Sequence, residues 1–165
     1  MTLNKNQFII FNEFFKENEE FNINDWSNKD FQIGRQDKGL YLKSTLHDLP
    51  DFVLDKIYQI IPETPESLMD SWHLVVQSDI PEHSDPGLIS LRYGCQYDHL
   101  RLNIILDDWI GFNIGKTSTL LNAGSAILFR ADEPHSTFSE YGKPINILSF
   151  GFMMLLPKLT FEYKI

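Results

Sequence analysis

The sequence predicts a mainly β protein of one domain, in which helices come first and an antiparallel, jelly-roll-like β core follows. The chain has 165 residues, 42% of them hydrophobic and 13 of them Phe, which is enough for one well-filled core. Helical spacing of apolar residues is confined to the first 70 residues. From residue 71 onward, short β-type runs alternate with turn residues, and such spacing favours a sandwich or barrel over βαβ units.

Within this single domain, 1–165, we expect an N-terminal support, 1–70, made of helices and a hairpin, and a β core, 71–165. Phe8, Phe11 and Phe15 recur at helical spacing, which predicts an amphipathic helix over about residues 4–19. Two alternating runs, Phe31–Ile33 and Leu40–Leu42, are separated by a turn that contains Gly39. They predict a hairpin.

A second helix is expected over Pro50–Ile61. Pro50 suits the first turn of a helix, and Pro62 and Pro65 would end it. One apolar face is supplied by Phe52, Val53, Ile57, Ile60 and Ile61.

The β core is predicted as a series of short strands with turn residues between most of them, among them Asp85-Pro86-Gly87 and Ala123-Gly124. The runs are Trp72–Gln77, Leu88–Tyr93, Leu100–Leu106, Thr117–Leu121, Ala126–Phe129, His135–Phe138, Ile145–Leu155 and Leu159–Tyr163.

Composition excludes several classes of function. The formal net charge of −9 argues against a nucleic-acid-binding surface, which needs clustered Lys and Arg. The single cysteine, Cys95, excludes an intramolecular disulfide and any site built from several cysteines. The longest apolar run, Ile147–Leu156, is far shorter than the ~20 residues of a membrane span, and the N-terminus is a poor signal peptide. We expect a cytoplasmic protein that acts on a small-molecule or peptide substrate; the sequence does not indicate its oligomeric state.

Three residues form a candidate metal site. His83 and Asp85 lie two apart, so an extended strand end presents both to one side. His135, after Pro134, begins a later strand and can complete the set. Two imidazoles and one carboxylate form the face that suits ferrous iron with positions left open for substrate and oxygen. The alternative is that these are three unrelated polar residues in loops.

Residues from about 70 to 156 resemble the iron(II)- and 2-oxoglutarate-dependent dioxygenases, whose double-stranded β-helix carries an HxD…H motif. The resemblance rests on His83-x-Asp85, His99–Leu106, Asn122–Phe129, His135 and Ile145–Phe150. The run Arg101–Leu106 is similar to the R-x-H-x-P-L segment of the aspartyl/asparaginyl and proline hydroxylase branch, although Asn103 and Ile105 stand where that segment has His and Pro.

The resemblance implies a cupin-like jelly roll that binds Fe(II) through His83, Asp85 and His135. It also implies 2-oxoglutarate as co-substrate and hydroxylation of an amino acid or a peptidyl side chain. The family's co-substrate Arg would fall at Ile145, and no Arg follows it.

A cation elsewhere must therefore take the place of that Arg, because a buried carboxylate needs a partner. The candidates are Arg101, Lys143 and Arg130. We favour Arg101, with Asn103 and Ser149 as hydrogen-bonding helpers, while a structural salt bridge is the other reading of Arg101. Arg92 and His99 are candidates for contact with the substrate.

Two further readings stay open. The lack of an Arg after His135 favours a non-catalytic, cupin-like binding protein that has lost 2-oxoglutarate binding. A metal-dependent isomerase or ring-cleaving dioxygenase on the same fold would need a third or fourth His or Glu near the first pair, a pattern that His83-x-Asp85 does not match.

Overall fold

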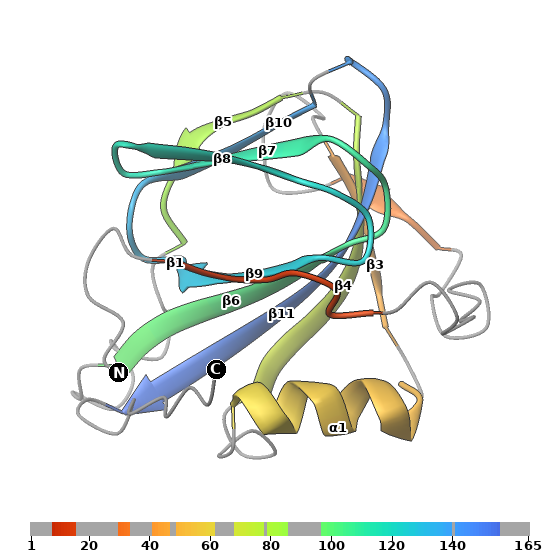
Figure 1. Cartoon of the computed structure of the whole chain (residues 1–165), viewed down its shortest axis with the longest axis vertical. Coiled ribbons are helices and arrows are strands. Elements are labelled where there is room, and N and C mark those ends of the chain that lie inside the picture. The colour runs from red at the N-terminus through yellow and green to blue at the C-terminus, as the bar shows by residue number, and fades with distance from the viewer. Residues whose placement is uncertain are drawn as a thin grey trace.

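Two antiparallel β-sheets face each other across the molecule (Figure 1). The computed structural model describes residues 8–15, 30–33, 41–46, 49–61, 68–77, 79–85, 97–139 and 141–155. The larger sheet has the strand order β1-β9-β6-β11-β4-β3-β2, and the smaller one β5-β10-β7-β8. The strands of the larger sheet are β1 (Phe8–Phe11), β2 (Gln32–Ile33), β3 (Tyr41–Thr45), β4 (Leu68–Val76), β6 (Tyr97–Ile105), β9 (Ala126–Arg130) and β11 (Ile145–Leu155). Those of the smaller sheet are β5 (Ile80–His83), β7 (Ile110–Ile114), β8 (Thr117–Leu121) and β10 (His135–Ser139).

From β4 onward the chain passes back and forth between the two sheets. β4, β6, β9 and β11 lie in the larger sheet, while β5, the β7–β8 hairpin and β10 lie in the smaller one. This alternation is the double-stranded β-helix, or jelly roll, that the sequence predicts. It brings the ends of β5 and β10, which are far apart in sequence, side by side.

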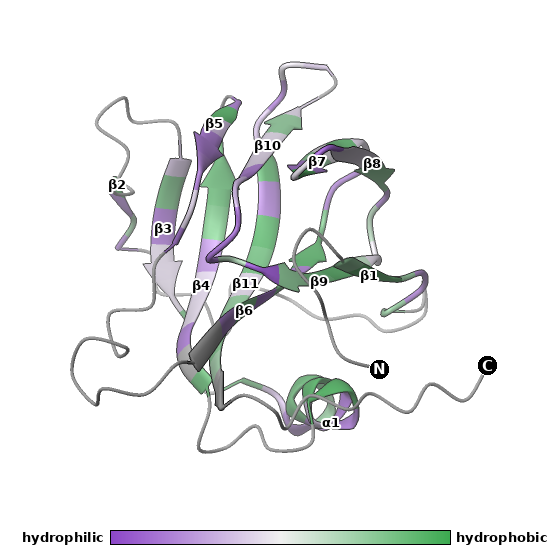
Figure 2. Cartoon of the chain, turned by 90° about the vertical axis from the view of Figure 1, so that its left-hand side faces the viewer, coloured by the Kyte–Doolittle hydropathy of each residue, from purple (hydrophilic) through white to green (hydrophobic). Residues whose placement is uncertain are grey.

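The central strands of the larger sheet, β6, β9 and β11, are largely buried on both faces. On β6, Leu100, Leu102 and Ile104 point to a layer that contains α1 (Asp51–Ile60), where Val53 and Ile57 are fully buried. The alternate residues of the strand point the other way, towards the smaller sheet. Figure 2 shows α1 beneath the larger sheet and the smaller sheet on its opposite side. A second apolar cluster, which includes Phe112, Phe129 and Ile147, fills the space between the sheets.

The prediction of a helix over about residues 4–19 is wrong for residues 8–15, the part of that range that the structure describes. Residues 8–11 form β1, which pairs with β9 from Phe8↔Phe129 to Phe11↔Ala126. The run Phe-Ile-Ile-Phe serves equally as a strand, and the edge of β9 supplies the hydrogen bonds that decide between the two states. Glu13 then turns the chain at a φ of 57°. The rest of the predicted helix, outside 8–15, lies beyond the described residues.

The other N-terminal predictions are confirmed in outline. β2 and β3 pair as a hairpin, and α1 forms where the apolar face was predicted, with Pro50 as the residue before its first turn. β8 and β11 have the predicted bounds. The strands predicted over 88–93 and 159–163 fall outside the described residues. None of the described helices has the length and apolarity that a membrane crossing requires.

β7 was missed by the sequence reading. It contains Gly111 and Asn113, both poor strand formers, and it follows Trp109 at a φ of 67°. Gly111 is needed because a side chain there would overlap the ring of Phe138 on the neighbouring β10. The strand is therefore specified by its partner, which a local pattern does not reveal.

Candidate metal centre

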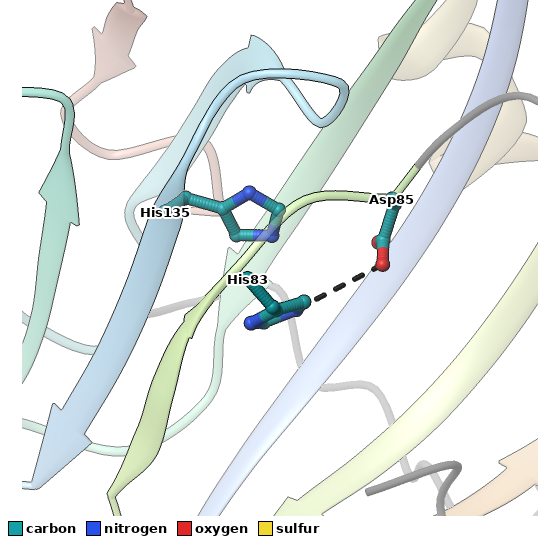
Figure 3. A group of neighbouring side chains, drawn as sticks. All are labelled: His83, Asp85 and His135. Atoms are coloured by element: carbon teal, nitrogen blue, oxygen red, sulfur yellow. Dashed lines mark ion pairs between the residues drawn. The ribbon is translucent and has the colours of Figure 1, made fainter.

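His83 and His135 meet because they lie opposite each other on neighbouring strands. β5 ends at His83, β10 begins at His135, and the two residues are paired in the ladder. Their ring centroids are 4.4 Å apart. Asp85 follows two residues later in the strand exit, where its backbone N–H donates to the carbonyl of Ala131 at 2.7 Å. The three side chains offer ligand atoms that all lie within 4.8 Å of one another (Figure 3).

Backbone carbonyls fix the tautomer of both imidazoles. Nδ1 of His83 lies 2.9 Å from the carbonyl oxygen of Pro81, and Nδ1 of His135 lies 2.9 Å from that of Glu133. A carbonyl only accepts, so each Nδ1 carries the proton and donates it. With Nδ1 engaged in this way, Nε2 is the nitrogen that each ring can offer to a metal, and Nε2 of His83 lies 3.8 Å from Oδ1 of Asp85 (Figure 3).

Burial keeps His135 uncharged. Its side chain is 4% exposed, and desolvation lowers its pKa to about 4. The hydrogen bond to Glu133 opposes this shift, and among the nearby charges His83 and Arg101 lower the pKa while Asp85 raises it. The imidazole is therefore neutral at physiological pH, as a metal ligand must be.

The donor set fits a divalent first-row ion. Two imidazoles and one carboxylate on one face form the facial triad that suits ferrous iron. Three ligand atoms on one face of an ion, each at about 2.1 Å from it, would lie about 3 Å from one another. From the observed limit of 4.8 Å, the side chains would therefore have to close by up to about 2 Å on binding the ion.

The triad opens on a cavity of about 310 Å³ between the two sheets. Its apolar part includes Val76, Ile80, Phe129 and Ile147. Its polar wall comes largely from β6, whose alternate residues His99, Arg101 and Asn103 all line the cavity. A metal at the triad would thus have a polar chamber beside it.

Arg101 is held by two carboxylates and a hydroxyl. Its Nη1 donates to Oδ1 of Asp70 at 3.2 Å and to Oγ of Ser149 at 3.0 Å, and its Nε lies 3.6 Å from Oδ2 of Asp85. Asp70 and Arg101 both face Gly151 in the ladders of β11. A Cβ at Gly151 would lie 2.6 Å from Oδ1 of Asp70, so the absence of a side chain there lets Asp70 reach across β11 to Arg101.

Three atoms of the β6 wall are buried without a hydrogen-bond partner among the described residues: Nε2 of His99, Nε of Arg101 and Oδ1 of Asn103. His99 is 5% exposed, and its Nδ1 donates to the carbonyl of Asp85 at 2.7 Å, which leaves Nε2 as an acceptor. Unsatisfied buried groups cost about 1–3 kcal/mol each, so this wall is suited to a polar ligand.

The structure brings most of the sequence-predicted site residues together. His83, Asp85, His99, Arg101, Asn103, His135 and Ser149 all line the one cavity. Lys143 lies elsewhere, in a second pocket with Asp107 and Tyr141. Arg130 is paired with Asp132 at 2.7 Å, and Arg92 lies outside the described residues.

Two charged residues of the cavity were missed by the sequence reading. Asp70 on β4 and Lys43 on β3 both line it. The alternation of side chains along each strand could have revealed both residues. Asp70 lies on the same face of β4 as Trp72, and Lys43 lies on the same face of β3 as Tyr41. A charged residue in the inward phase of a strand is a candidate for a site.

No family model matches the sequence, and no curated protein matches it. Among solved structures, the chain is similar to KdgF from Halomonas sp., with a TM-score of 0.47 and 10% identity over 75% of this chain and 86% of that one. It is also similar to a predicted oxalate decarboxylase from Thermotoga maritima, with a TM-score of 0.46 and 11% identity over 69% and 81% of the two chains. A cupin domain of an XRE family transcriptional regulator from Enterobacter cloacae gives a TM-score of 0.46 and 10% identity over 68% and 96%. With TM-scores below 0.5, none of these likenesses bears on what this chain does.

Proposed function

We propose that this chain is an oxygenase that uses Fe(II) and 2-oxoglutarate to hydroxylate an amino acid or a peptidyl side chain. The observation that carries the proposal is the facial set of His83, Asp85 and His135, opening on a cavity that also contains cations. Two imidazole nitrogens and one carboxylate would hold a ferrous ion and leave it able to take further ligands.

The bound ion would supply the activation of oxygen, with one oxygen atom going to the substrate while 2-oxoglutarate is converted to succinate and CO₂. The chain's own contribution is to hold the ligands in place. The carbonyls of Pro81 and Glu133 orient the two imidazoles, and the strand exit pinned to Ala131 positions Asp85. The apolar part of the cavity restricts water beside the site.

The charges of the loaded cavity suit a dianion. A divalent ion, Arg101 and Lys43 would supply four positive charges, and Asp70 and Asp85 supply two negative ones. Two positive charges remain uncompensated, which is the charge that a dicarboxylate such as 2-oxoglutarate would balance. Asn103 and Ser149 on the same wall add hydrogen-bonding groups.

Anaerobic titration with Fe(II) and then 2-oxoglutarate tests the proposal. We expect a weak visible charge-transfer band to appear, and succinate to form once oxygen is admitted. His83→Ala should abolish both signals. Glu82→Ala, which changes the exposed neighbour of His83 on the same strand, should leave them intact. A wild-type protein that binds iron but shows neither signal would rule out this activity.

One observation favours a second candidate, a non-catalytic metal-binding protein. The charge of Arg101 is already balanced by Asp70 and Asp85, so Arg101 is not free to bind a dicarboxylate without disturbing those pairs. Metal binding without any binding of 2-oxoglutarate would establish this alternative. Among the described residues, no fourth His or Glu joins the metal-ligand group, which gives the isomerase and ring-cleaving readings no support.

A further inference from the structure

Two cations line the cavity among the residues that the structure describes, and they differ in how their charge is compensated. Arg101 on β6 contacts the carboxylates of Asp70 and Asp85. Lys43 on β3 contacts the ring of Trp72, with Nζ 4.2 Å from the ring centroid. None of the described carboxylates forms an ion pair with Lys43. Among the residues that the structure describes, Lys43 is therefore the cation of the cavity that has no carboxylate partner.

The register of the strands places Lys43 in the cavity wall beside the Asp70 end of β4. Lys43 is paired with Leu74 on β4, and Trp72 is the next cavity-facing residue along β4 in the direction of Asp70. By lying over Trp72, the ammonium leans towards the part of the cavity where Asp70 and Asp85 surround Arg101. The aromatic face holds an ammonium in place by cation–π attraction but leaves its positive charge available.

The cost of admitting a carboxylate differs at the two cations. At Arg101 an incoming carboxylate must compete with Asp70 for Nη1 and share the residue with Asp85. At Lys43 no ion pair with a described residue has to be broken, and a compact ammonium with three donors can turn towards the ligand. A carboxylate in a partly buried chamber goes to the cation that can compensate its charge fully.

We propose that Lys43, positioned by Trp72, binds the far carboxylate of the oxo acid, so that the cavity selects dianionic over monoanionic oxo acids. This inference rests on the proposed function and assigns the binding of that carboxylate to β3, a strand outside the alternating jelly-roll core. Arg101 then has a different role: it holds Asp85 and Asp70 in place beside the metal centre.

The test compares two oxo acids on the Fe(II)-loaded protein under anaerobic conditions. The probes are 2-oxoglutarate, a dianion, and 2-oxobutyrate, a monoanion that lacks the far carboxylate. In Lys43→Met we expect the Kd for 2-oxoglutarate to rise about 10–100-fold, the range for losing a hydrogen-bonded charge partner. The Kd for 2-oxobutyrate should stay within about threefold, because its chelating end is unchanged. Lys43→Arg should keep most of the selectivity.

Lys116→Met provides the matched control, since it removes the same charge from an exposed position outside the cavity and should change neither Kd. An unchanged Kd for 2-oxoglutarate in Lys43→Met, or an equal loss for both acids, overturns the inference while the proposed function stands. A wild-type protein that binds the ion and neither acid removes the proposed function, and this inference with it.

Discussion

Gly151→Ala should destabilise the protein through one identifiable contact. The new methyl would lie 2.6 Å from Oδ1 and 3.0 Å from Cγ of Asp70, whereas ordinary contacts of a Cβ begin at 3.4 Å. Asp70 must therefore withdraw, and its hydrogen bond of 3.2 Å to Arg101 weakens. Overpacking of this kind costs about 1–3 kcal/mol, against about 0.5–1 kcal/mol gained because Ala restricts the unfolded chain. We expect a net loss of about 0.5–2 kcal/mol.

A double-mutant cycle measured by urea denaturation isolates this contact. In an Asp70→Ala background the methyl meets no carboxylate, so Gly151→Ala should become neutral or slightly stabilising. The coupling free energy should then be about 1–3 kcal/mol. In an Asp70→Asn background the substitution should remain costly, because the amide has the size of the carboxylate. An equal cost of Gly151→Ala in all three backgrounds would refute the assignment of the clash to Asp70.

Three further outcomes are expected. The pKa of His135 in the folded protein is about 4, below the ordinary 6.5, so as pH falls the unfolded chain binds a proton at His135 before the folded protein does. The metal-free protein should therefore lose up to about 3 kcal/mol of unfolding free energy as pH falls from 6.5 to about 4, and urea titrations of His135→Asn should show a flatter pH profile. Asp85→Asn should weaken the binding of Mn²⁺ or Fe²⁺, measured by calorimetry, at least about 100-fold. This exceeds the roughly 10–100-fold loss expected when a residue that only hydrogen-bonds to a metal ligand is removed. Glu82→Gln should leave metal binding unchanged. Phe112→Ala should cost about 3–5 kcal/mol in the same denaturation assay, while Leu120→Ala, at an exposed edge position, should cost below about 0.5 kcal/mol.

The sequence was sufficient for features that depend on short stretches of chain. The spacing of His83 and Asp85, the apolar face of α1 and the apolar β-type run of β11 are local patterns, and the structure contains all three elements. The jelly-roll class followed from the succession of such stretches. The choice of 2-oxoglutarate, the hydroxylase branch and the substrate stay predictions, since they depend on ligands that a fold does not identify.

What the sequence could not supply depends on pairing between distant strands. β1 is a strand because it pairs with the edge of β9, where Phe8 lies opposite Phe129 and Phe11 opposite Ala126. The meeting of Asp70 with Arg101 requires the registers of β4, β11 and β6 together, and the stacking of Lys43 on Trp72 requires that of β3 with β4. Distance along the chain also made Lys143 a candidate beside the favoured Arg101, but Lys143 lies in another pocket.

Among the strands that the structure describes, β5 has one neighbour, β10, and it ends at a metal-ligand candidate. If this short edge strand detaches in a local opening, His83 and Asp85 leave His135 together, so the site is lost as a unit. An ion that bridges both strands would oppose this fraying, and amide hydrogen exchange along β5 should slow when metal is added while exchange in β6 and β11 hardly changes. Hydrogen exchange along β5 would then show whether the metal site is occupied, and the measurement needs no substrate.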